Sequence, residues 1–435
     1  MRTRQKLGFV AFRVSHLTPV GNKRRRCLKP QPGCKSFARR ATLVPAARYQ
    51  AKLGTDMQFI DLGAQRARIH DRLKAAMDKV VEEGRYILGP QVAEFEAKLA
   101  DYVGVKHVVA CANGTDALLL PLYASGVGPG DAVFVPSFTF AATAEVVALA
   151  KAEPIFVDVD AKTYNIDIES LEAAIAMVKA EGRLKPKAII PVDLFGLAAD
   201  YDAIMAIAKR ENLLVIEDAA QSIGGTADNA KCGAFGHVAG TSFYPAKPLG
   251  CYGDGGAMFT NDAALAEKLR SFAFHGKGET QYDNVHVGIN SRLDTLQAAI
   301  LIEKLAILED EMVARQKVAA RYAEGLGDIV TAARNLDGTR SAWAQYAIET
   351  PKRDGLKAHL QEKGIPSVIY YVKPLHEQVA YRHFPRTPTG LAVSEGLPNR
   401  ILCLPMHPYL SEADQDRVIE TIRNYIGSNS AQAAE

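Results

Sequence analysis

One lysine, Lys247, lies between two prolines in the stretch SFYPAKPLGCYGDGG, residues 242–256. A residue that precedes a proline is pushed out of the helical region, so Lys247 belongs to a loop rather than to the inside of a helix. Pro245, two positions earlier, further restricts this loop and would fix the direction of the amine. A lysine that attacks carbonyl compounds needs such positioning and a lowered pKa. A surface lysine in a proline-rich turn would show the same pattern, so other residues must decide.

Asp218 is the second residue that could do chemistry. It lies at the carboxyl end of an apolar strand in IEDAAQ, and Gln221 follows one turn later. A carboxylate there can hold a pyridine nitrogen protonated, which makes a pyridoxal ring an electron sink. An aspartate between a strand and a short helix is also a common N-cap. The position of Asp218 alone leaves both roles open.

A third pattern is typical of a phosphate site. In CANGTDALLL, Gly114 and Thr115 form a turn directly before a helix, where free N–H groups and the helix dipole favour an anion. Ser242, five residues before Lys247, could add a hydroxyl. Phe140, just past the strand AVFVPSF, could stack on a flat ring, although a lone phenylalanine is as often part of a core.

Taken together, these features would serve one cofactor: a Schiff-base lysine, an acid for the ring nitrogen and a phosphate cradle. The sequence has no G-x-G-x-x-G and no G-x-x-x-x-G-K-[ST] motif, so dinucleotide and P-loop functions lose their main support. It has no H-E-x-x-H motif, and its six cysteines form no C-x-x-C pair. We therefore expect no metal site, no disulfide framework and a reducing, cytoplasmic compartment.

The elements that must position these residues follow from the apolar pattern. From about residue 107, short apolar runs alternate with helical patterns, which predicts an α/β fold with a mainly parallel sheet and helices on both faces. Its ligand is expected beyond the carboxyl ends of the strands. TSFYP and GGAMFTND are expected to be strands on either side of the glycine-rich turn. A long helix over 293–326 then leads into a mixed segment with short strands such as AQYAIET and PSVIYY.

Charge divides the chain unevenly. Residues 1–56 hold 14 Lys or Arg and a single acid, whereas the rest carries a net charge of −10. We expect 1–56 to be a disordered extension or the result of a start assigned too early; a transit peptide or a nucleic-acid-binding arm is the alternative. The expected domains are a large one over 57–305 and a smaller α+β one over 306–427, with a frayed tail over 428–435. The most apolar window, from Ala132, contains Pro136 and Glu145, so we expect no membrane insertion.

Seven motifs together resemble one family: CANGTDAL, PSFTFAATAE, VDLFG, IEDAAQS, TSFYPAKPLGCYGDGGAMFTND, FHG and GINSRLDTLQAAIL. They are similar to the motifs of the DegT family, sugar-nucleotide aminotransferases that depend on pyridoxal 5′-phosphate. The resemblance runs from Met57 to about residue 425. It implies the aspartate-aminotransferase type of fold (PLP fold type I), with a mainly parallel seven-stranded sheet in the large domain and a smaller C-terminal α+β domain.

The resemblance also implies a role for each candidate residue. Lys247 would bond covalently to the cofactor aldehyde, Asp218 would pair with the pyridine nitrogen, and Gln221 would contact the ring hydroxyl. The phosphate would be held by Gly114, Thr115 and Ser242, with Phe140 stacked on the ring.

Further residues would act between subunits or on the substrate. Asn290 matches a residue that reaches the cofactor phosphate of a neighbouring subunit, which implies a homodimer with shared active sites. Arg292 and Tyr371 match positions that meet the sugar. Tyr370 replaces a histidine of some relatives.

The implied reaction is amination of a nucleotide-linked keto-sugar with glutamate as donor. Relatives with histidine in place of the lysine catalyse dehydration or deoxygenation, so Lys247 favours transamination. The expected substrate is a UDP-linked 3-keto-N-acetylhexosaminuronic acid, aminated at C3 for lipopolysaccharide, O-antigen or capsule synthesis. A dTDP-3-keto or 4-keto-sugar aminotransferase is the first alternative. A non-catalytic regulatory or nucleic-acid-binding relative is the second.

Overall fold

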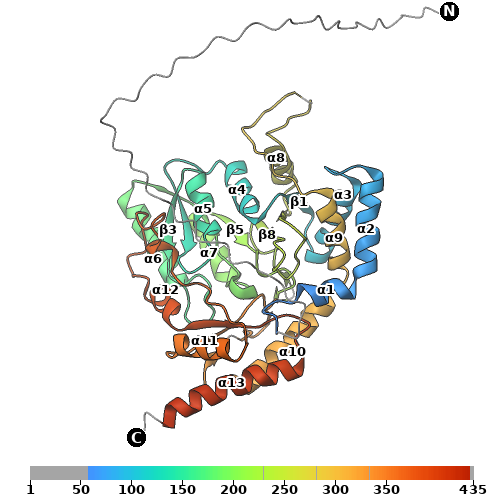
Figure 1. Cartoon of the computed structure of the whole chain (residues 1–435). Coiled ribbons are helices and arrows are strands. Elements are labelled where there is room, and N and C mark those ends of the chain that lie inside the picture. The colour runs from blue at the N-terminus through green and yellow to red at the C-terminus, as the bar shows by residue number, and fades with distance from the viewer. Residues whose placement is uncertain (1–56, 229, 281, 333, 432–435) are drawn as a thin grey trace, which may run out of the picture. The chain divides into compact units, whose positions relative to one another are not determined.

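The computed structural model describes residues 57–228, 230–280, 282–332 and 334–431 (Figure 1). The extension predicted over 1–56 lies outside this part of the chain, as do residues 432–435 of the predicted tail. The described residues form one compact unit. The predicted boundary between two domains at residue 305 therefore stays a prediction.

A seven-stranded sheet with the order β1-β9-β8-β5-β4-β2-β3 forms the centre of this unit. Within the sheet, β9 runs antiparallel to both of its neighbours, and the remaining neighbours pair in parallel. This confirms the predicted mainly parallel sheet. Its strands are β1 (His107–Cys111), β2 (Asp131–Pro136), β3 (Glu153–Val157), β4 (Lys185–Ile189), β5 (Leu214–Asp218), β8 (Val238–Ser242) and β9 (Gly256–Thr260). The strand expected over TSFYP lies three residues earlier, because pairing with β9 ends at Ser242 and Gly256.

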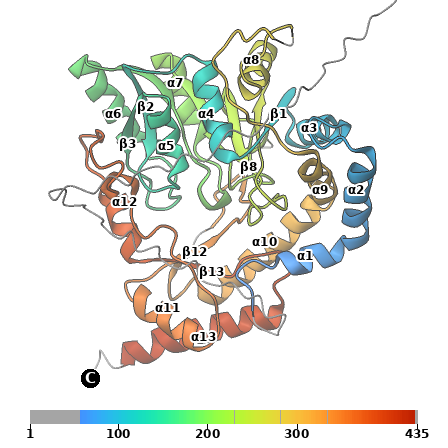
Figure 2. The same cartoon turned by 45° about the horizontal axis from the view of Figure 1, so that its top comes forward.

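Helices cover both faces of this sheet, because alternate strand residues point to opposite sides (Figure 2). Val109 and Val133 pack with the helices of one face, while Val108 and Phe134 pack with those of the other. The first face carries α4 (Gly114–Ala124), α5 (Ala142–Leu149) and α8 (Ala263–Ala273). The second face carries α3 (Pro90–Val103), α6 (Ile168–Glu181), α7 (Tyr201–Glu211) and α9 (Thr295–Leu305). Two further helices, α1 (Leu62–Arg68) and α2 (His70–Glu83), begin the described part of the chain.

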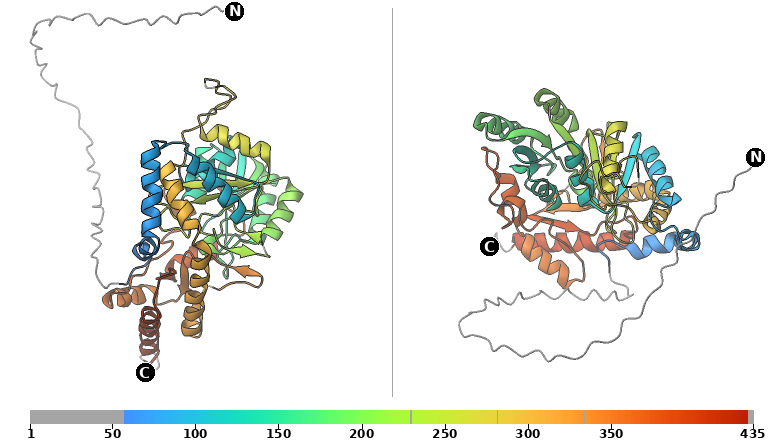
Figure 3. Two further views of the ribbon diagram at one scale, coloured as in Figure 1. Left: turned by 90° about the vertical axis from the view of Figure 1, so that its right-hand side faces the viewer. Right: turned by 90° about the horizontal axis from the view of Figure 1, so that it is seen from above.

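The single helix predicted over 293–326 is wrong. The chain forms α9 and then α10 (Leu308–Leu326), with a break at Ile307. The Ile307 N–H donates to the carbonyl of Lys304 over 3.1 Å in a tight turn, and the Ile307 side chain is buried in a cluster with residues of α2. The break therefore lets α9 lie beside α2 against the large sheet (Figure 3), while α10 continues toward the C-terminal part.

The C-terminal part contains a three-stranded antiparallel sheet with the order β10-β12-β13. Its elements are β10 (Thr331–Ala332), β12 (Tyr346–Glu349), α11 (Arg353–Glu362), α12 (Ala392–Gly396), β13 (Ile401–Leu404) and α13 (Glu412–Ala431). A small sheet of two-residue strands comprises β6 (Thr226–Ala227), β7 (Ala230–Lys231) and β11 (Thr339–Arg340). The expected strand PSVIYY is reduced to one bridge between Val368 and Cys403, because the chain then leaves the sheet and brings Tyr371 to Gln221. None of the helices in the described ranges is long and apolar enough to cross a membrane.

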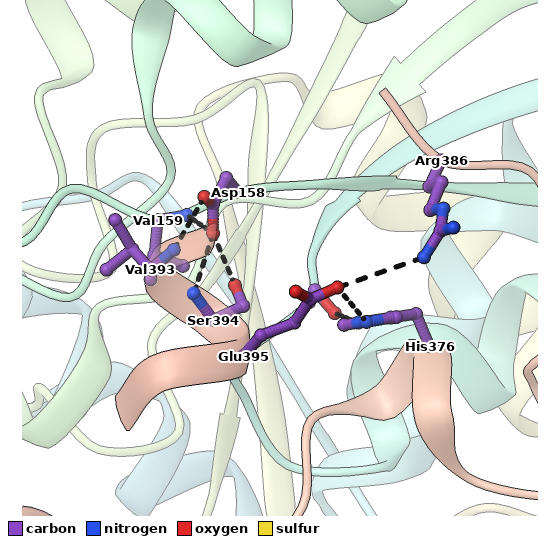
Figure 4. A network of polar contacts seen from close by, with 8 residues as sticks. Asp158, Val159, His376, Arg386, Val393, Ser394 and Glu395 are labelled. Carbon is purple, nitrogen blue, oxygen red and sulfur yellow. Dashed lines mark hydrogen bonds and ion pairs between the residues drawn. The ribbon is translucent and has the colours of Figure 1, made fainter. Parts of the chain in front are cut away.

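A buried polar network fastens the segment around α12 to the large sheet (Figure 4). Asp158, which follows β3, accepts hydrogen bonds from the Val393 N–H (3.0 Å), the Ser394 N–H (2.8 Å) and the Ser394 hydroxyl (2.6 Å). Glu395 contacts Nε2 of His376 at 3.3 Å, and Nδ1 of the same ring lies 2.6 Å from Oγ of Ser137. Ser137 follows β2. These bonds hold the segment that includes Tyr370 and Tyr371 close to the carboxyl ends of the strands.

Candidate active site

Asp218 is a desolvated acid at the end of β5. It is 5% exposed, and its carboxylate accepts hydrogen bonds from the Thr143 hydroxyl (3.0 Å) and the Ala220 N–H (3.2 Å). Burial raises the pKa of Asp218, and these two donors together with the charge of Lys247 oppose that rise. A buried carboxylate with bonding capacity to spare suits a cationic partner, such as a protonated ring nitrogen.

Lys247 lies in the loop between β8 and β9, as predicted. The Lys247 N–H donates to the carbonyl of Tyr244 over 2.8 Å, which closes a tight turn. Burial lowers the pKa of Lys247, and the nearby charge of Asp218 opposes that shift. A larger neutral fraction makes the amine a better nucleophile toward a carbonyl carbon. The structure thus brings together the lysine and the acid, which are separated by 29 positions in the sequence.

The residues expected to form a phosphate cradle lie together where α4 begins. A Cβ added at Gly114 would lie 2.6 Å from the Cβ of Ser242, so only glycine allows this close approach. Asn113 caps the helix by accepting a hydrogen bond from the Asp116 N–H over 2.8 Å. Thr115 is the second residue of the helix and is partly exposed. Backbone N–H groups and hydroxyls of three predicted residues therefore converge near a helix N-terminus, a donor set that fits a phosphate.

Phe140 does not belong to the core. Its side chain is 59% exposed, although it lies four residues past the end of strand β2 and two residues after the buried Phe138. A large aromatic ring left in water just beyond the carboxyl ends of the strands is available to stack on a planar ligand. This exposure agrees with the predicted contact and argues against a packing role.

Gln221 and Tyr371 meet across 150 residues. The amide of Gln221 donates to the Tyr371 hydroxyl over 3.2 Å, and its oxygen accepts a hydrogen bond from the Phe195 N–H over 2.7 Å. Burial raises the pKa of Tyr371, so its hydroxyl keeps its proton at neutral pH. The ring of Tyr370 lies 5.7 Å from that of Tyr371. The predicted sugar-site tyrosines are thus joined to the predicted cofactor site.

The structure does not bring Asn290 and Arg292 into this group. Asn290 is exposed and bridges to Phe274, and the Arg292 guanidinium lies 5.0 Å above the Phe274 ring. Arg292 lines a separate cavity of about 480 Å³, and Lys247 and Asp218 are not among the described residues around it. The role of Asn290 at a neighbouring subunit's cofactor remains a prediction.

Two contributors to the site were not predicted from sequence. Thr143 bonds to Asp218, and Ser291 bonds to Asp116 (2.6 Å) and to the Ala112 N–H (3.1 Å), which ties residue 291 to the start of α4. Thr143 lies about one helical turn after Phe140 at the start of α5. This spacing from a predicted site residue could have identified Thr143 in the sequence. Ser291 gave no comparable signal, because its partners lie 175 or more positions away in sequence.

The residues present fit pyridoxal 5′-phosphate. The close approach of Gly114 to Ser242 supplies the phosphate cradle, Asp218 supplies the buried acid, and Lys247 supplies an amine with a lowered pKa. With Phe140 beside them, these groups match an aldehyde-bearing aromatic ring with a phosphate at one end.

Comparison with known proteins identifies the family that the motifs resemble. The sequence model of the DegT/DnrJ/EryC1/StrS aminotransferase family matches residues 67–423 of this chain. A UDP-2-acetamido-2-deoxy-3-oxo-D-glucuronate aminotransferase of Pseudomonas aeruginosa is 46% identical over 373 residues, covering 85% of this chain and 100% of the relative.

Two solved structures are similar in fold. A DegT DnrJ EryC1 StrS aminotransferase from Brucella abortus is 72% identical, with a TM-score of 0.85, and the match covers 85% of this chain and 100% of that one. NtdA from Bacillus subtilis with bound cofactor PMP is 29% identical, with a TM-score of 0.76, and the match covers 85% and 83% of the two chains.

Proposed function

Because the chain belongs to the DegT/DnrJ/EryC1/StrS aminotransferase family, we propose that it transfers an amino group to a nucleotide-linked keto-sugar with pyridoxal 5′-phosphate as its cofactor. One observation carries this proposal: Lys247 and Asp218 lie close enough for each to affect the other's pKa, beside the cradle of Gly114 and Ser242.

When bound, the cofactor supplies an electron sink for the bond that breaks at the amino-bearing carbon. The chain's own residues do the rest. Asp218 would hold the ring nitrogen protonated, Phe140 would cover the ring face, and Gln221 would orient the ring hydroxyl. The Lys247 amine would hold the cofactor in the resting enzyme and, when free, would act as the base that takes the proton from the amino-bearing carbon and as the acid that gives it back.

We further propose a UDP-linked 3-keto-N-acetylhexosaminuronic acid as the amino acceptor and glutamate as the donor, in the synthesis of lipopolysaccharide or capsule. The relative from Pseudomonas aeruginosa, named for such a 3-oxo-glucuronate substrate, supports this acceptor. Arg292 would bind the sugar carboxylate and Tyr371 the sugar itself. The described cysteines are buried and free, which agrees with a reducing, cytoplasmic compartment.

The active enzyme is proposed to be a homodimer. Arg292 lines a cavity whose described lining includes neither Lys247 nor Asp218, and two exposed apolar side chains, Tyr282 and Val287, lie in the preceding segment. A second copy of the chain would place these residues at a shared site.

Replacement of Lys247 tests the proposal. Lys247→Ala is expected to lower multiple turnover by at least about 10²- to 10⁴-fold, the usual contribution of a positioned proton-transfer group. Turnover would be measured with glutamate and a panel of UDP- and dTDP-linked 3-keto and 4-keto sugars, so the same assay identifies the acceptor. Lys247→Arg keeps the charge but cannot bond to the aldehyde, and should be equally inactive.

Lys268→Ala, at an exposed position on α8, is the control. Borohydride reduction of the wild type followed by peptide mass mapping should place a pyridoxyl group on Lys247. Normal multiple turnover by Lys247→Ala would refute the assignment.

A further inference from the structure

A second lysine, Lys304, is buried directly behind the loop that carries Lys247. Its residue is 1% exposed, near the C-terminal end of α9. Lysine is almost never fully buried without a partner. Its Nζ donates to the carbonyl oxygen of Gly250 over 2.5 Å and lies 4.5 Å from the centre of the Tyr252 ring. Lys304 therefore contacts the backbone three residues beyond Lys247.

The loop that Lys304 contacts, residues 243–251, is folded back on itself; we call it the lysine loop. The Cys251 N–H donates to the carbonyl of Phe243 over 2.8 Å, and the loop contains the tight turn at Lys247. A Cβ at Gly250 would lie 2.5 Å from the carbonyl oxygen of Pro245, so the two arms are in contact. A constraint applied at Gly250 is thus passed directly to the arm that includes Lys247.

A second contact from α9 reinforces the first. Oε1 of Gln297 accepts a hydrogen bond from the Tyr252 N–H over 2.8 Å. Gln297 and Lys304 lie two turns apart on the same helix, so both face the end of the lysine loop. Helix α9 in turn packs against α2 and α3. The loop is therefore held by a helix that is itself fixed to the large unit.

Burial of a lysine at this position costs free energy, because its ammonium group loses water. Burial lowers the pKa of Lys304 to about 8, and Glu311 and Cys251 oppose that shift. Glu311 is itself buried and accepts hydrogen bonds from Gln65 at 3.0 Å and Tyr409 at 2.5 Å. An apolar side chain of similar length would fill the same space without desolvating an ammonium group. Packing alone therefore does not explain the amine.

We propose that Lys304 is a positioning residue: it holds the Gly250 carbonyl and so keeps the lysine loop in the conformation that directs the Lys247 amine toward Asp218. The proposal rests on the proposed function for the role of Lys247. It assigns Lys304 no contact with substrate or cofactor. Loss of the bond between Lys304 and Gly250 would change the direction of the Lys247 amine but would remove no residue from the site.

The test compares Lys304→Met, which keeps length but removes charge and donor, with Lys304→Arg, which keeps both. Lys317→Met, exposed on the neighbouring helix α10, is the matched control. The first readout is hydrogen exchange in the cofactor-free chain. Lys304→Met should raise exchange at Lys247 and Cys251 at least about tenfold while strand β5 is unchanged, because the bond from Lys304 ties Gly250 of the loop to α9.

The second readout uses the cofactor-loaded enzyme. Lys304→Met should lower kcat by about 10²-fold with little change in KM, since a small misplacement of a reacting group costs that much. The pH titration of the visible band of the Lys247-bound cofactor should shift as well. Lys304→Arg should recover most of kcat. If Lys304→Met does not fold, Lys304→Gln, a shorter donor, is judged by the same measurements.

Two results would overturn the proposal. One is a Lys304→Met variant whose hydrogen exchange in the lysine loop and whose kcat both equal those of Lys317→Met. The other is an increase in exchange spread evenly over the sheet, which would make Lys304 only a stabilising residue. The exchange experiment needs no cofactor. It therefore still reports on the lysine loop if Lys247→Ala shows the proposed function to be wrong.

Discussion

At the scale of single residues, burial shifts Asp218 and Lys247 toward their neutral forms, and the charge of each opposes the shift of the other. Both shifts are typical of a reactive site, where ionisable groups are desolvated next to a partner. The residue types of Asp218 and Lys247, together with the residues that flank them, allowed both to be predicted from the sequence. Thr143 and Lys304 were not, because a hydroxyl or an amine in a helix shows its partner only after distant segments have come together.

A second buried pair lies next to this site. Asp193 and Glu217 are both fully buried, and Asp193 accepts hydrogen bonds from the hydroxyls of Ser222 (2.7 Å) and Tyr201 (2.8 Å). Burial raises the pKa of Asp193 from 3.8 to about 6, and burial together with the charge of Asp193 raises the pKa of Glu217 well above its usual value. The folded chain thus binds protons here that the unfolded chain has already released.

This pair predicts a pH dependence of stability. The contribution of Asp193 is fully present below about pH 4 and declines as the pH rises through about 6, since a raised carboxyl pKa favours the folded state only while the proton is bound. Asp193→Asn removes one of the two titrating carboxyls and should therefore reduce the fall of Tm between about pH 4 and 7, measured by calorimetry. Asp202→Asn, at an exposed position of α7, is the control, and an unchanged slope in Asp193→Asn would contradict the prediction.

At the scale of elements, the alternation of strands and helices over residues 107–218 was predictable, because apolar runs and helical periodicity there agree with the local structure. The break at Ile307 was not, because neither glycine nor proline marks it. Its cause is tertiary: the side chain of Ile307 is buried beside α2. The segment 366–371 keeps only the bridge between Val368 and Cys403, and its last residue, Tyr371, bonds to the distant Gln221.

The junction between β3 and α12 gives a prediction at this scale (Figure 4). Asp158→Ala should lower the free energy of unfolding by about 2–4 kcal/mol, because a charged acceptor of several buried donors is lost. Ser394→Ala should cost less. The double variant should show a coupling of about 0.5–3 kcal/mol in denaturant unfolding. Strictly additive effects would mean that the contact does not hold α12 in place.

At the scale of the whole molecule, the segment around residues 282–290 extends apolar side chains into water. Tyr282 is 89% exposed and Val287 is 94% exposed, and both are close in sequence to Asn290. Exposed large apolar groups beside a residue that is predicted to reach a second subunit favour contact with another chain. Neither composition nor strand pattern could have located this surface, because exposure is a property of the folded chain.

Mixing two inactive variants tests the shared site. Lys247→Ala lacks the reactive amine, and Asn290→Ala lacks the residue expected to reach across to the partner. In a mixed dimer one of the two sites keeps both residues, so random exchange should restore about a quarter of wild-type activity. Activity would be measured after the chains have been exchanged, with exchange confirmed by native mass spectrometry. Confirmed mixed dimers without activity would show that each chain forms its site alone.

The register between β5 and β8 pairs Asp218 with Gly240, two residues before Ser242. Ser242 itself pairs with Gly256 of β9, so strand β8 fixes the spacing between the acid and the cradle hydroxyl. Attempts to redirect the enzyme to other sugars are therefore better aimed at the exposed residues of the 282–290 segment, which contributes no strand to that sheet. Substitutions at the ends of these strands are expected to displace both groups and to yield mostly inactive variants.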